Sequence, residues 1–178
     1  MNKVIVVPYN PNWVKQYEGA SLEIKAALGI NLVDIHHIGS TSIPGIYAKP
    51  IIDMLVVVND LLLLDKDSCH MEDLGYEARG EFGIEGRRYF PRNNAVGERT
   101  HQVHAFQAGS THIHRHLVFR DYMRSHPAAA HDYAVLKRRL AEAHPYDLNA
   151  YMDGKDAFIQ NMDIKALAWD AAGRVKPL

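Results

Sequence analysis

The chain has 178 residues, of which 47% are hydrophobic. This length and composition predict one globular domain over residues 1–178 and exclude a disordered polypeptide. The 20 lysines and arginines are matched by 21 acids, which gives a net charge of -1. No overall basic excess therefore attracts the chain to nucleic acid or to a membrane surface.

The single cysteine, Cys69, excludes a disulfide within the chain and favours a reducing compartment. The start of the chain is not followed by a secretory hydrophobic region, and no apolar run approaches the ~20 residues that cross a bilayer. We therefore expect a cytoplasmic protein without a membrane partner. The oligomeric state stays open at this stage.

The first third of the chain predicts a helix and then two strands. Asn10 can cap a helix whose first position is Pro11, and Gly29 ends that helix. We expect the strands over about 31–37 and 50–58. The second strand is almost wholly apolar, which is typical of a strand buried on both faces.

The middle of the chain predicts a helix and three short strands. The helix runs from Leu61 to about Leu74. Strands are expected over 76–81 and 87–92, joined by a turn with two glycines, and over 100–107 after an exposed loop. Alternation places three side chains of the last strand on one face: Gln102, His104 and Phe106.

The C-terminal third is predicted to be helical. Ser110 or Thr111 can cap a helix that runs to about Ser125, Pro127 begins a second helix, and Asp147 can cap a third. Because strands come first and helices follow, the sequence predicts an α+β fold. We expect a mixed β-sheet with flanking helices and a C-terminal helical layer.

A glycine-serine turn, followed by a strand that carries one acid, is the strongest chemical signal. Gly39 allows the backbone to approach a ligand closely, and the amides and hydroxyl groups that follow it can bind an anion. Asp53 is the one acid in the apolar strand about a dozen residues later. A carboxylate there needs a metal, a hydrogen-bond network or a cation. An ion pair with Lys49 or with an arginine is the purely structural interpretation.

Seven short motifs extend this signal along nearly the whole chain. Three surround the turn and the acid: His37-Ile38-Gly39-Ser40-Thr41, Ile43-Pro44-Gly45 and Ala48-Lys49-Pro50-Ile51-Ile52-Asp53. Four lie downstream: Gly86-Arg87-Arg88-Tyr89-Phe90, Thr100-His101-Gln102-Val103-His104, Arg115-His116-Leu117-Val118-Phe119-Arg120-Asp121-Tyr122 and Tyr133-Ala134-Val135-Leu136-Lys137. In order and spacing, the chain resembles the GrpB family, whose members have the nucleotidyltransferase fold.

This resemblance implies binding of a nucleotide or another phosphorylated small molecule, with Mg²⁺ as cofactor and nucleotidyl transfer as the enzymatic activity. Asp53 and His104 are then the candidate catalytic and metal-ligating residues. The candidate phosphate-binding residues are Gly39, Ser40, Thr41, Lys49, Arg87 and Arg88. If 87–92 is a strand, the two arginines face opposite sides, and only one of them can reach the pocket.

Leu55 departs from the pattern of the superfamily, in which a second acid two residues after the first completes the metal site. Leucine cannot coordinate a metal, and a carboxylate with one histidine is a weaker magnesium site than three carboxylates. The alternative is therefore a non-catalytic nucleotide- or metabolite-binding module on the same fold. A third interpretation is a transition-metal protein, because His112 and His116 share a helix face, but two ligands do not complete a site.

Overall fold

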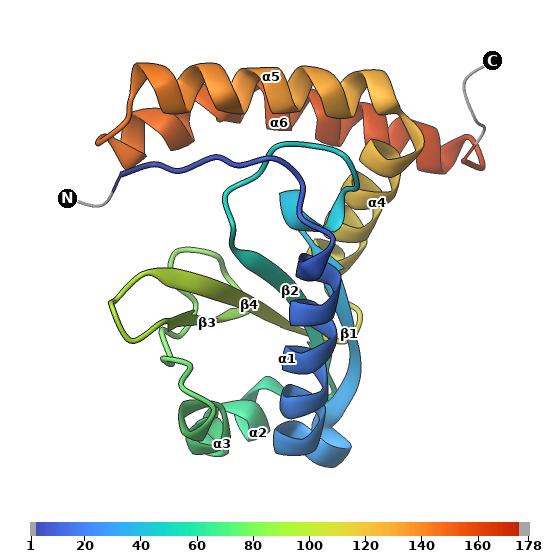
Figure 1. Cartoon of the computed structure of the whole chain (residues 1–178). Helices are drawn as coiled ribbons and strands as arrows, with labels where there is room; N and C mark the ends of the chain where they lie inside the picture. Colours follow the sequence, from blue (N-terminus) through green and yellow to red (C-terminus); the bar gives the residue numbers. More distant parts are fainter. Residues whose placement is uncertain (1–2, 175–178) are drawn as a thin grey trace.

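The computed structural model describes residues 3–174, in which a mixed sheet is followed by a layer of helices (Figure 1). The strands are β1 (Leu32–Ile38), β2 (Ile52–Val58), β3 (Arg87–Asn93) and β4 (Arg99–Gln107). The α-helices are α1 (Asn12–Leu28), α2 (Leu61–Lys66), α3 (Ser68–Asp73), α4 (Thr111–Ser125), α5 (Pro127–Ala143) and α6 (Leu148–Ala171). Two short 3-10 helices flank β1: η1 (Gly29–Asn31) and η2 (Ser40–Ser42). No helix within residues 3–174 is long and apolar enough to span a membrane.

The sheet has the strand order β1-β2-β4-β3. Its two central strands, β2 and β4, are parallel, and each outer strand is antiparallel to its neighbour. Asp53 is paired with Gln102, and Leu55 is paired with His104. Because alternate residues of a strand share a face, these four side chains project from the same side of the sheet.

The two faces of the sheet pack against different helices. On one face, α1 and α3 cover a core that includes Met54 and Val103. On the other face, Leu55 and Phe106 pack against Leu117 of α4. Helices α5 and α6 contact one another and lie across one end of the sheet, where α4 also meets α6 (Figure 1). Asp53, Gln102 and His104 are thus directed towards the C-terminal helices.

The prediction of a strand over 76–81 is wrong. Tyr76 forms only an isolated bridge with Arg92, and the rest of the segment runs beside β3 without a regular ladder. Glu77 N donates to Pro91 O at 2.9 Å. Proline has no N–H group and cannot donate a bond in return, so the pairing that would define a strand is interrupted here.

The predicted helix from Leu61 to about Leu74 is divided into α2 and α3. Asp67 lies between them with φ -100° and ψ 16°, outside the helical region. At the N-terminus, α1 begins at Asn12, and Asn10 Oδ1 accepts a hydrogen bond from Asn12 N at 3.0 Å. The capping side chains predicted for two C-terminal helices are confirmed at Ser110 and Asp147.

Gly19 in α1 and Gly154 in α6 give a matched test of the packing between α5 and α6. We expect Gly19→Ala to raise the free energy of unfolding by about 0.5–1 kcal/mol, because alanine favours a helix and no atom lies within 4 Å of the added Cβ. Gly154→Ala should raise the free energy of unfolding by less, because the added Cβ would lie 2.5 Å from Leu140 Cδ2 and Leu140 would have to move. Urea denaturation measures both changes, and equal gains would contradict the close helix packing.

Candidate functional site

The turn after β1 brings its backbone against Asp53. Gly39 has φ 67°, and a Cβ at this position would collide with the Asp53 carboxylate. The register of β1 and β2 sets this approach, because Ile38 is paired with Asp53. Ser42 Oγ donates to Gly39 O at 2.6 Å and holds the turn closed. Position 39 therefore requires glycine both for its left-handed conformation and for the space beside the carboxylate.

Thr41, a predicted phosphate-binding residue, instead stabilises this turn through buried hydrogen bonds. Its hydroxyl is buried and donates to Ile51 O at 3.1 Å. The same oxygen lies 3.0 Å from His37 Nε2. Because the threonine proton is already donated to Ile51 O, the oxygen accepts a hydrogen bond from the Nε2–H group of His37. Burial lowers the pKa of His37 to about 4, so the ring is neutral at pH 7. Thr41 does not line the cavity described next.

A cavity of about 350 Å³ lies between the polar ends of the strands and the C-terminal helices. Five predicted site residues line it: Gly39, Ser40, Lys49, Asp53 and His104. The helices α4, α5 and α6 contribute the remaining walls, including Phe119, Tyr133, Lys137, Tyr151, Lys155 and Ile159. The turn and the acid-bearing strand predicted from the sequence thus meet at one cavity, and helices far along the chain enclose it.

Asp53 and His104 form the polar pair at its floor. His104 Nε2 lies 3.8 Å from Asp53 Oδ1. On the other side of the ring, Arg87 Nη1 lies 3.4 Å from His104 Nδ1. A guanidinium group only donates, so Nδ1 is the acceptor of this bond, and Nε2 is the ring nitrogen that faces Asp53.

The two predicted arginines do not line the cavity. Arg87 is buried, and it donates to the backbone oxygens of Glu81 at 3.1 Å and Phe82 at 2.7 Å. It reaches the cavity only through His104. Arg88 forms a two-bond ion pair with Asp65, as expected for neighbouring strand residues that face opposite sides.

Two lysines that the sequence reasoning missed enter the cavity from α5 and α6. Lys137 is 2% exposed and Lys155 is 7% exposed, which is rare for lysine. Each follows a buried tyrosine by four residues, Tyr133 and Tyr151, and so lies on the same helix face. This spacing was the available signal, because it places both lysines on the face of the helix that packs inwards.

Burial makes these amines unusually easy to deprotonate. It lowers the pKa of Lys137 to about 7, and the neighbouring charge of Lys155 acts in the same direction. Burial also lowers the pKa of Lys155 to about 8, with a further contribution from Lys49. The pKa of Lys49 is lowered by burial as well, and the carboxylate of Asp53 opposes the decrease for all three amines.

The residues around Asp53 do not fit a magnesium ion. Within residues 3–174, no group of three or more His, Cys, Asp or Glu side chains is arranged to hold a metal. The position of the second acid is Leu55, which is fully buried in an apolar cluster. Three lysines share the cavity with the one carboxylate, and their positive charge disfavours a divalent cation.

His112 and His116, two of the three histidines of α4, both pack against the ring of Phe106. His116 lines the Asp53 cavity, and burial lowers its pKa to about 3. His112 stacks on Phe106 with ring centroids 5.0 Å apart. Ring packing therefore accounts for His112 without a metal.

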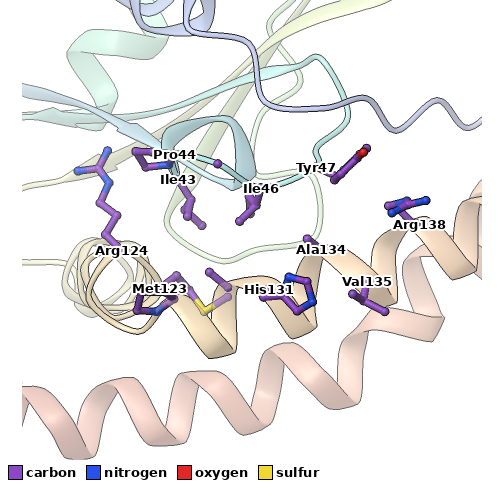
Figure 2. Close-up of a pocket in the computed structure, with 13 residues that line it drawn as sticks. Ile43, Pro44, Ile46, Tyr47, Met123, Arg124, His131, Ala134, Val135 and Arg138 are labelled. Carbon is purple, nitrogen blue, oxygen red and sulfur yellow. The ribbon is translucent and has the colours of Figure 1, made fainter. Parts of the chain in front are cut away.

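A second cavity, of about 620 Å³, lies between the 43–47 loop and helices α4 and α5 (Figure 2). Most of its lining is apolar. Both of its arginines are engaged: Arg124 donates twice to Ser42 O, at 2.7 and 2.9 Å, and Arg138 lies over the ring of Tyr47, 4.6 Å from its centroid. Among the described residues the two guanidinium groups are thus held by a backbone oxygen and a ring, and no lysine lines this cavity.

The mixed sheet, with an acid on a central strand beside a glycine-serine turn, places this chain among the α+β proteins with a nucleotidyltransferase-like fold. The structure of Cid1 in complex with its short product ApU is similar, with a TM-score of 0.53 and 13% identity. The match covers 83% of this chain and 48% of the Cid1 chain. At this identity the likeness shows the fold alone.

The pattern of the GrpB family, described as GrpB protein, matches residues 3–165. The crystal structure of the conserved protein GrpB from Enterococcus faecalis has 45% identity and a TM-score of 0.88, over 92% of this chain and 98% of that one. YqkA of Bacillus subtilis, a UPF0157 protein, is 44% identical over 167 residues, which make up 94% of this chain and 48% of YqkA. The chain therefore belongs to the GrpB family, as its motifs predict, and it spans about half the length of YqkA.

Gly39→Ala tests the close approach of the turn to Asp53. We expect it to lower the free energy of unfolding by about 2 kcal/mol or more, because a side chain at φ 67° and ψ -172° costs about 1–3 kcal/mol and the new Cβ overlaps the carboxylate. Gly45→Ala is the control, because φ there is also positive, at 79°, but no atom lies within 4 Å of the added Cβ. Equal losses in urea denaturation would contradict the contact.

Proposed function

We propose that this protein binds a nucleotide or another phosphorylated small molecule in the Asp53 cavity, without magnesium. The observation that carries the proposal is the set of three lysines beside the Gly39–Ser40 turn. Enzymes of this fold use metal ions to neutralise phosphate, and here ammonium groups occupy the cavity in their place.

The charge of the cavity favours an anionic ligand. Lys49, Lys137 and Lys155 against Asp53 leave an excess of two positive charges when all are ionised. Arg115 also lines the cavity, but its Nη1 is 2.8 Å from Asp163 Oδ2, so its charge is already matched. A phosphate monoester at pH 7 carries about -1.5 to -2 charges, which balances this excess.

The size and the walls of the cavity favour a small ligand. A volume of about 350 Å³ is near the lower end of the range of roughly 300–1,000 Å³ typical of small-molecule sites. Phe119, Tyr151 and Ile159 add aromatic and apolar surface to its walls. A nucleotide-sized molecule, with one anionic end and one flat or apolar end, matches both parts.

Magnesium-dependent nucleotidyl transfer is the second candidate function. The observation that favours it is the contact between the Gly39 turn and Asp53 on a fold of this class. Its difficulty is the donor set, in which His104 is 3.8 Å from Asp53 and Leu55 replaces the second acid. The two candidates differ in what Asp53 does: in transfer it is indispensable, and in metal-free anion binding its negative charge opposes the ligand.

A thermal-shift screen with Asp53→Asn separates them. Nucleoside mono-, di- and triphosphates are tested at pH 7, with magnesium and with chelator, and Asp73→Asn on the exposed side of α3 is the control. Our proposal predicts a shift in chelator that Asp53→Asn retains or increases. At a ligand concentration 100 times Kd the stabilisation is about 2.7 kcal/mol, which corresponds to roughly 5–10 °C in Tm for a chain of this size.

A shift that needs magnesium and disappears in Asp53→Asn would favour nucleotidyl transfer, and released pyrophosphate would establish it. If no nucleotide or phosphorylated metabolite changes Tm, both candidates fail.

A further inference from the structure

We infer that Lys49, Lys137 and Lys155 together bind the terminal phosphate of a monoester and reject phosphate diesters. This inference rests on the proposed function, because it assigns the ligand class of the same cavity. Its basis is the position of three amines that have no acid partner and lie around one cavity.

Lys137 carries the argument furthest. Its Nζ is buried and has no hydrogen-bond partner within the described residues. It lies over the ring of Tyr133, whose centroid is 4.4 Å away, and the charge of Asp53 acts on it without a hydrogen bond. A buried ammonium group without an acceptor is strongly unfavourable, so an anion in the cavity would supply the acceptor that this side chain lacks.

Lys155 and Lys49 are nearly as poorly satisfied. Lys155 Nζ donates to the sulfur of Met152 at 3.3 Å, which is a weak acceptor. Lys155 Nζ and Lys49 Nζ lie 4.4 and 5.8 Å from the ring centroid of Tyr151. Within residues 3–174, no carboxylate lies within 4 Å of any of the three amines, although Asp53 lines the same cavity.

Arg115, His116 and Tyr133, which also line the cavity, leave this excess of positive charge unchanged. Arg115 is paired with Asp163. Burial lowers the pKa of His116 to about 3 and raises that of Tyr133 to about 12, so both are neutral at pH 7. Asp156, beside Lys155 in the chain, is exposed on α6.

The chemistry of phosphate then selects the ligand. A monoester has three free oxygens and a second pKa near 6, so each of three ammonium groups can donate to its own oxygen. A diester has two free oxygens and a single negative charge. It compensates less of the positive charge, and its second ester group stands where the third amine would meet a free oxygen of a monoester.

Proton uptake provides a signature that a merely structural lysine would not give. At pH 8, Lys137, with a pKa of about 7, is mostly neutral, and Lys155, with a pKa of about 8, is about half charged. A bound dianion raises both pKa values, so the complex gains protons from the buffer. A monoester is already fully ionised at this pH, so it does not supply them.

The test is isothermal titration calorimetry of the full chain at pH 8 in chelator. The probes are phenyl phosphate and its diester, methyl phenyl phosphate, which have the same aromatic group. Each is titrated in Tris and in HEPES, because the difference in heat between these buffers reports the protons taken up. Lys137→Met and Lys155→Met remove the buried amines, and exposed Lys165→Met is the matched control.

We expect phenyl phosphate to bind with uptake of about one proton, and the diester to bind at least tenfold more weakly. Lys137→Met should reduce both the affinity and the proton uptake, Lys155→Met should reduce the affinity, and Lys165→Met should change neither. Equal binding of the diester, or unchanged proton uptake in Lys137→Met, would overturn the inference. If nucleotides still shift Tm in that case, the proposed function survives. If phenyl phosphate does not bind and no nucleotide shifts Tm, both are wrong.

Discussion

The contact between the Gly39 backbone and the Asp53 carboxylate is the constraint on which the rest of the site depends. It follows from the pairing of β1 with β2, which places the end of one strand opposite the single acid of the other. A side chain at position 39 would separate them. Because the turn must fold against the acid, its hydroxyl groups divide into two kinds: Ser40 lines the cavity, and Thr41 is buried beneath it.

The cavity differs from a metal site in the way its charge is balanced. Leu55 belongs to an apolar cluster with Ile38 and Phe106, so an acid there would be buried among hydrocarbon groups. Positive charge comes instead from α5 and α6, through Lys137 and Lys155. The C-terminal helices therefore do more than cover the sheet, because they supply the groups that give the cavity its excess of positive charge.

The sequence predicts the frame of the fold well, because capping residues and apolar periodicity are local signals. It fails at 76–81, where Pro91 on the neighbouring strand interrupts the pairing, and that information lies outside the segment. The sequence predicts that Asp53 lies beside the Gly39 turn, because the two residues are close together in the chain. It misses Lys137 and Lys155, because their role depends on the packing of helices about a hundred residues away from Asp53 in the sequence.

A crystal structure of the protein grown with adenosine 5′-monophosphate and chelator tests the central claim most directly. Our account predicts a phosphate group in the Asp53 cavity, with its oxygens within hydrogen-bond distance of Lys137 Nζ and Lys155 Nζ, and no metal ion beside Asp53. A nucleotide bound in another part of the molecule, or one in this cavity whose phosphate does not contact the lysines, would contradict it.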